Sequence, residues 1–77
     1  MKIHVIAKAG DLRFTAREAE DCIDKAKKYE VRCDILDKDI MALFSTKFKL
    51  MLDGTKENIE DFLNYLKMMG FRIKKVS

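Results

Sequence analysis

The sequence predicts one α+β domain of the ferredoxin-like type, with the order β-α-β-β-α-β, over residues 1–77. We expect a four-stranded antiparallel sheet with two helices on one of its faces. Three observations support this prediction. The chain is long enough for one domain only. Four segments alternate apolar and polar side chains with the period of two that is typical of strands. Two further segments repeat apolar residues at helical spacing, and each follows a threonine that can cap a helix.

The first strand is predicted for residues 3–9, with Ile3, Val5 and Ala7 on one side. The first helix should begin at Thr15, whose Thr-Ala-Arg-Glu pattern is that of a capping box. Apolar residues follow at helical spacing, namely Ala16, Ala19, Ile23, Ala26 and Tyr29, with Cys22 at the margin of the stripe.

The second and third strands are predicted for residues 31–36 and 47–52. Between them, residues 40–44 are apolar without a clear period. We expect them to continue the second strand beyond a bulge, with a short helical turn as the alternative. Residues 45–46 would then form the hairpin turn. The core side of the two strands would consist of Val31, Cys33, Ile35, Phe48, Leu50 and Leu52.

The second helix should be capped by Thr55 and end at Gly70, because a helix often ends with a glycine in the left-handed conformation. Its predicted apolar side consists of Ile59, Phe62, Leu63, Leu66 and Met69. We expect the pair Met68 and Met69 to fill the core. A last strand would begin at Phe71.

The second face of the sheet has no cover within the predicted fold. Alternation places twelve residues on it: His4, Ile6, Lys8, Arg32, Asp34, Leu36, Lys47, Lys49, Met51, Arg72, Lys74 and Val76. Six of them are cations and one is a carboxylate. The candidate site residues are His4, Ile6, Lys8, Arg32, Lys47, Lys49, Met51, Arg72 and Lys74.

Three interpretations of this face remain open. The first is an ordinary solvated sheet face. The second is an interface between copies of the chain, with a dimer as the expected oligomer. The third is a surface for an anionic partner, either a small molecule or a nucleic acid. Nucleic acid has the weaker support, because the central strands offer no aromatic side chains for base stacking.

The sequence predicts no catalytic site, no cofactor and no metal site. His4 is the only histidine, and no partner for acid–base chemistry lies near it in sequence. Cys22 and Cys33 match neither a redox pair nor a zinc-binding pattern. We expect two buried thiols, with a disulfide as the alternative.

Met1 leads directly into the first strand, and no apolar run is long enough to span a membrane. We therefore expect a cytoplasmic protein without a membrane partner. Lysine is abundant and glutamine is missing, which is typical of hyperthermophile proteins, and an AT-rich genome is the alternative explanation.

From Val31 onward, the chain resembles the NIL domain. Asp34-Ile35-Leu36 stands where that family has its Asn-Ile-Leu tripeptide, with aspartate in place of asparagine. Residues 48–54 and 66–73 are similar to the family's glycine-ended strand and to its helix end and last strand. NIL domains are ferredoxin-like, ACT-related regulatory modules of methionine-import ATPases and of archaeal sulfur-metabolism proteins. The resemblance implies a non-enzymatic module that senses a small molecule or associates with itself.

Overall fold

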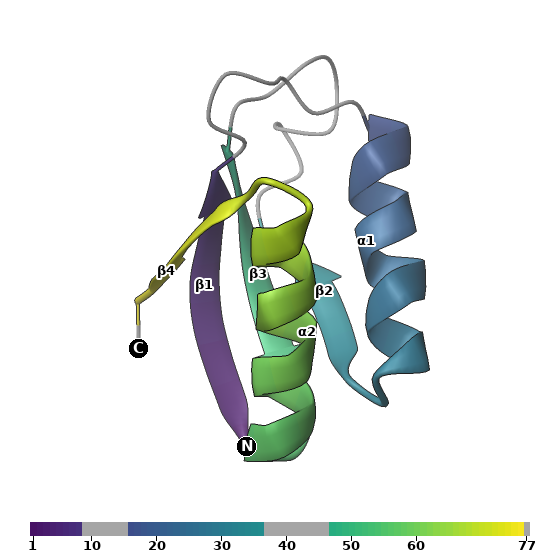
Figure 1. Cartoon of the computed structure of the whole chain (residues 1–77), viewed down its shortest axis with the longest axis vertical. Coiled ribbons are helices and arrows are strands. Elements are labelled where there is room, and N and C mark those ends of the chain that lie inside the picture. Colours follow the sequence, from purple (N-terminus) through teal and green to yellow (C-terminus); the bar gives the residue numbers. More distant parts are fainter. Residues whose placement is uncertain (9–15, 37–46, 77) are drawn as a thin grey trace.

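The computed structural model describes residues 1–8, 16–36 and 47–76, and they form a four-stranded antiparallel sheet with two helices (Figure 1). The elements are β1 (Lys2–Lys8), α1 (Ala16–Lys28), β2 (Arg32–Ile35), β3 (Lys47–Asp53), α2 (Lys56–Met68) and β4 (Arg72–Lys75). The predicted order β-α-β-β-α-β is confirmed. Thr15, residues 40–44 and the hairpin turn at residues 45–46 lie outside the described residues, so the predictions for them remain untested.

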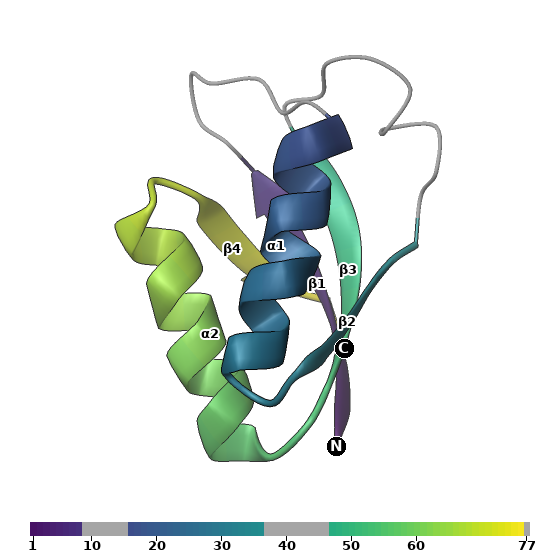
Figure 2. The same ribbon diagram turned by 90° about the vertical axis from the view of Figure 1, so that its right-hand side faces the viewer.

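The strands are arranged in the order β2-β3-β1-β4, so β1 and β3 are central. Both helices lie on the same face of the sheet, as the rotated view shows (Figure 2). The fold is therefore ferredoxin-like, and the face opposite the helices carries no element among the described residues. The register aligns Val5 with Leu50 and Ile6 with Lys49. It also aligns Ile6 with Lys74.

The core lies between the helices and the sheet, and every strand residue in it lies on the predicted side of its strand. The side chain of Phe48 lies outside the described part of the structure. Leu50 and Leu52 of β3 are fully buried, and so are Phe62 and Leu66 of α2. The burial pattern of β1 alternates strictly, because successive side chains of a strand point to opposite faces. This alternation directs the even-numbered residues of β1 to the open side.

The two helices end in the same way. At the end of α2, the Phe71 N–H donates to the Leu66 carbonyl over 3.1 Å, and Gly70 has a φ of 100°. At the end of α1, the Val31 N–H donates to the Ala26 carbonyl over 3.0 Å. These hydrogen bonds are those of a Schellman motif. The predicted cap of α2 is also confirmed, because the Thr55 hydroxyl accepts from the Asn58 N–H over 3.1 Å.

The prediction that Met68 and Met69 fill the core is wrong. Met68 is 87% exposed and Met69 is 56% exposed. The apolar side of α2 ends at Leu66, because the helix stops at Met68 and the chain turns through Gly70 into β4. Phe71 and Ile73 pack against the core at this point instead.

Candidate functional site

The candidate site is the open sheet face, which we define by the twelve residues that alternation placed on it. The strand register arranges them in rows that cross the sheet. One row contains Lys47, Lys8 and Arg72, and the next contains Lys49, Ile6 and Lys74. A third row contains Asp34, Met51 and His4. The structure thus brings eight of the nine predicted site residues into three neighbouring rows.

Five cations gather at one end of this face, which we call the basic end: Lys8, Lys47, Lys49, Arg72 and Lys74. Lys8 is directly opposite Lys47 on one side and directly opposite Arg72 on the other. Residues paired in this way have Cβ atoms roughly 5 Å apart, and like charges at that separation destabilise a sheet. Their placement therefore raises the free energy of the fold unless an anion offsets it.

The ion pairs of the described residues leave most of the basic end without a counter-charge. They join the Met1 amine to Asp53, Lys27 to Asp24, Arg32 to Asp34, and Lys75 to Glu60. Lys47 has an interaction of its own. Within the described part of the chain, no carboxylate forms an ion pair with Lys8, Lys49, Arg72 or Lys74. These four cations are exposed to solvent and available to a partner.

A shallow apolar hollow adjoins the basic end. It has a volume of about 470 Å³ and is lined by His4, Val5, Ile6, Leu36, Lys49 and Val76. Leu36 is 46% exposed and Val76 is 56% exposed, so both present apolar surface to solvent. Alternation had placed both on this face, but the predicted site did not include them. Both residues line the hollow, which sequence alternation alone could not predict.

Arg32 does not join the basic end. Its Nε lies 3.3 Å from a carboxylate oxygen of Asp34, two residues further along the same strand. In the register it is opposite Asp53, which in turn is opposite Lys2. This end of the open sheet face therefore has balanced charges, and the excess of cations is confined to the other end.

The described residues offer no arrangement suited to catalysis or to metal binding. No group of three or more His, Cys, Asp or Glu residues among them could hold a metal ion. His4 is directly opposite Met51 in the strand register, and Asp34 lies on the other side of Met51. Cys22 and Cys33 are buried and form no disulfide, so the disulfide alternative does not apply to this structure. Burial, followed by the proximity of Cys22 and Asp34, raises the pKa of the Cys33 thiol to about 12.

The aromatic side chains that the structure describes lie on the helix side of the sheet. Tyr29, Phe62 and Tyr65 form a cluster with ring centroids 5.9–6.4 Å apart, and Phe71 packs against the core. A surface that stacks bases needs exposed rings. Among the residues whose side chains are described, the open sheet face presents none.

Comparison with protein-family models, curated proteins and solved structures finds no match to this chain. The resemblance to NIL domains therefore stays a prediction. None of the helices that the structure describes is long and apolar enough to cross a membrane.

Proposed function

We propose that this protein is a non-enzymatic binding module that holds a small anionic ligand on its open sheet face. The observation that carries the proposal is a group of four exposed cations on three adjacent strands, whose like charges repel one another and form no ion pair with a described carboxylate: Lys8, Lys49, Arg72 and Lys74. A bound carboxylate or phosphate would turn this repulsion into attraction. Charge-assisted hydrogen bonds from lysine and arginine would hold such a group.

The ligand should also have an apolar part. Ile6 lies between Lys49 and Lys74, and both Ile6 and Lys49 line the apolar hollow, so the hollow overlaps the basic end. Leu36 extends the apolar surface beside Lys49, and Val76 extends it beside His4, away from the basic end. An apolar group placed there would be removed from water, which is favourable by about 25 cal/mol per Å² of apolar surface buried. An amphipathic anion therefore fits this surface better than a simple anion does.

Face-to-face association of two copies has less support than ligand binding. Two open sheet faces that met would each contribute the same excess of cations, and the balanced end near Arg32 offers no surplus of carboxylates to neutralise them. Nucleic acid is the second candidate, because a row of cations can also contact phosphates. It would bind without base stacking, for the reason given above.

A titration with octyl phosphate, followed by the amide shifts of ¹⁵N-labelled protein, tests the proposal. Octyl phosphate supplies both an anion and an apolar chain, whereas inorganic phosphate and octanol each supply only one of them. We expect octyl phosphate to bind more tightly than either and to shift the amides of β1, β3 and β4 around Ile6. Equal affinity for octyl phosphate and octanol, or shifts confined to the helices, would contradict the proposal.

Two neighbouring lysines provide a matched pair of variants. Lys74 lies at the basic end, whereas Lys75, the next residue of β4, points to the other side of the strand and pairs with Glu60 over 3.6 Å. Lys74→Ala should weaken octyl phosphate binding several-fold, and Lys75→Ala should leave it unchanged. Single-stranded oligonucleotides form the second arm. Affinity that rises with oligonucleotide length and falls steeply with salt would favour nucleic acid instead.

A further inference from the structure

The two edge strands of the sheet differ in charge. β4 is one edge, and three of its four residues are cations: Arg72, Lys74 and Lys75. Such an edge resists pairing with a second copy, because lysines would meet lysines. β2 is the other edge, and it carries one cation, Arg32, and one carboxylate, Asp34. The edge formed by β2 lacks this protection.

The backbone of β2 also presents free groups at this edge. The Leu36 N–H donates to the Lys49 carbonyl of β3 over 3.0 Å. Hydrogen-bonded and non-hydrogen-bonded pairs alternate along an antiparallel ladder. The even-numbered residues of β2 therefore direct their backbone groups toward β3. Cys33 and Ile35 direct theirs outward, where no described strand pairs with them.

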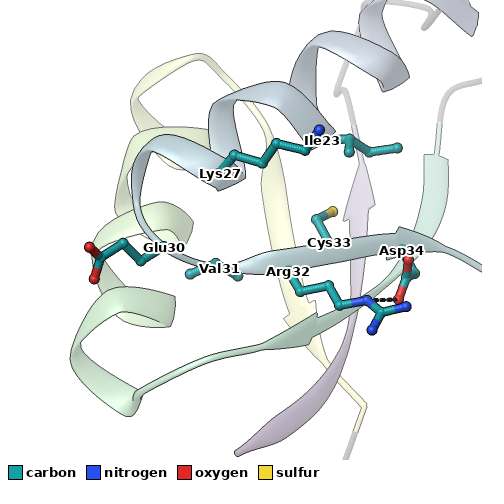
Figure 3. Close-up of a pocket in the computed structure, with 7 residues that line it drawn as sticks. All are labelled: Ile23, Lys27, Glu30, Val31, Arg32, Cys33 and Asp34. Carbon is teal, nitrogen blue, oxygen red and sulfur yellow. Dashed lines mark ion pairs between the residues drawn. The ribbon is translucent and has the colours of Figure 1, made fainter.

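Apolar surface lies beside these groups. A hollow of about 430 Å³ runs along the edge between α1 and β2 (Figure 3). Its apolar lining comes from Ile23 of α1, from Val31 just before β2 and from Cys33 on β2. Four charged residues complete the lining: Lys27, Glu30, Arg32 and Asp34. Ile23 and Ile35 belong to the helix side of the sheet but are only half-buried, whereas Leu50 on the central strand β3 is fully buried. An added strand would cover this edge.

We propose that a second copy of this chain pairs antiparallel with β2, with Cys33 opposite Cys33 of the second copy. This register lets the two Cys33 residues exchange a pair of backbone hydrogen bonds, since their N–H and C=O groups point outward. It also lets each Ile35 N–H donate to the Val31 carbonyl of the other copy. The result is one continuous eight-stranded sheet. The open sheet face stays uncovered, so the proposal is independent of anion binding.

Charge complementarity selects both the occupant and the register. With Cys33 opposite its counterpart, Arg32 of each copy lies opposite Asp34 of the other. Lys2, Asp53 and Arg32 lie opposite one another across the sheet and alternate in the sign of their charge. Asp34 of the second copy would be the next residue in this row and would continue the alternation. A shift that centres the pairing on Asp34 or on Arg32 would oppose like charges. A shift that centres it on Ile35 would place Asp34 opposite Leu36.

A charge exchange between copies tests this pairing. Both side chains are exposed, Arg32 by 78% and Asp34 by 54%, so the variants should fold, and circular dichroism verifies this. In Arg32→Glu, each new carboxylate faces Asp34 of the other copy. In Asp34→Arg, each new cation faces Arg32. Each variant alone should therefore dimerise at least about tenfold more weakly than the unmodified chain.

An equal mixture of the two variants should restore the dimer, because both opposed pairs in the mixed dimer carry opposite charges. Analytical ultracentrifugation up to millimolar concentration measures this, with a dimer of twice the 9.0 kDa chain mass as the expected species. An unmodified chain that stays monomeric overturns the proposal. It is equally overturned by variants that dimerise as well as the unmodified chain, or by a mixture that dimerises no better than its components.

Introduced cysteines test the register separately. Arg32 and Asp34 of the second copy would form a non-hydrogen-bonded pair with Cα atoms about 4.5 Å apart, which a disulfide can bridge. Identical positions would be diagonal neighbours roughly 7–8 Å apart, which is too far. The cysteines are introduced into a chain that carries Cys33→Ala, because this register also brings the two Cys33 residues opposite each other with Cα atoms about 5.5 Å apart. In that background, Arg32→Cys and Asp34→Cys should cross-link only when mixed, relative to Glu57→Cys on α2 as the collision control. Efficient cross-linking of Asp34→Cys alone would show a different register and overturn this one.

Discussion

Replacing Lys8 by glutamate should stabilise the fold and weaken anion binding at the same time. Lys8 stands between two cations, Lys47 on β3 and Arg72 on β4. A glutamate at this position would change two repulsive cross-strand pairs into two attractive pairs. The substitution exchanges one charged side chain for another on the exposed side of β1, so the core is left intact.

The magnitude follows from the cross-strand geometry. Each directly opposed pair of charges contributes roughly 0.2–1 kcal/mol, and exposure to solvent places these pairs at the low end of that range. Losing two repulsions and gaining two attractions would sum to about 1–2 kcal/mol. Lys47 also interacts elsewhere, which reduces its share. We therefore expect the free energy of unfolding to rise by about 1 kcal/mol.

Lys2→Glu is the matched control. Lys2 lies on the same strand but opposite Asp53, so the same change of charge creates a repulsion there. Both variants lower the net charge from +3 to +1, which is a change of two units. Lys2→Glu should therefore lower the free energy of unfolding, by about 0.5 kcal/mol.

Urea unfolding, followed by circular dichroism at low salt and at about 1 M salt, measures both effects. The two shifts should have opposite signs and should shrink at high salt, where the Debye length is only about 3 Å. Equal shifts of the same sign would mean that net charge alone matters. A destabilising Lys8→Glu would refute the argument from the row of cations, and octyl phosphate binding that survives this substitution would count against the basic end as the ligand site.

Three further predictions concern the fold. Leu50→Ala should lower the free energy of unfolding by about 2–5 kcal/mol because Leu50 is fully buried, whereas Met51→Ala on the open side should cost far less in the same urea titration. Gly70→Ala should lower the free energy of unfolding by about 1–2 kcal/mol, because a φ of 100° disfavours any side chain even though no atom lies within 4 Å of the new Cβ. An unchanged unfolding midpoint would contradict this. The pKa of Cys33 is raised from 9.0 to about 12 in the folded state, so the thiol keeps its proton more tightly there than in the unfolded chain. Its contribution to stability is therefore complete below pH 9 and is lost as the pH rises toward 12, and Cys33→Ala should flatten this part of the stability profile.

The order of the elements and the core could be predicted from local patterns. Alternation identified the inward side of every strand, because the period of two in a strand leaves only two choices of face. The cap at Thr55 and the glycine stop at Gly70 could be predicted too, since both depend on neighbouring residues only. Local patterns were less reliable at Met68, the last residue of α2, and at Met69, its C-cap, because both are exposed to solvent at the point where the helix ends.

The organisation of the open sheet face was decided by the tertiary structure. The sequence established that this face carries six cations and one carboxylate, but not which of them are neighbours. The register between strands places Lys8 between Lys47 and Arg72, and it separates Arg32 from them. Alternation along a strand identifies a face, whereas neighbours across a sheet depend on how distant segments align. The alignment of the strands also determines which edge of the sheet has balanced charges. This alignment depends on hydrogen bonds between strands, and no single segment of the sequence encodes them.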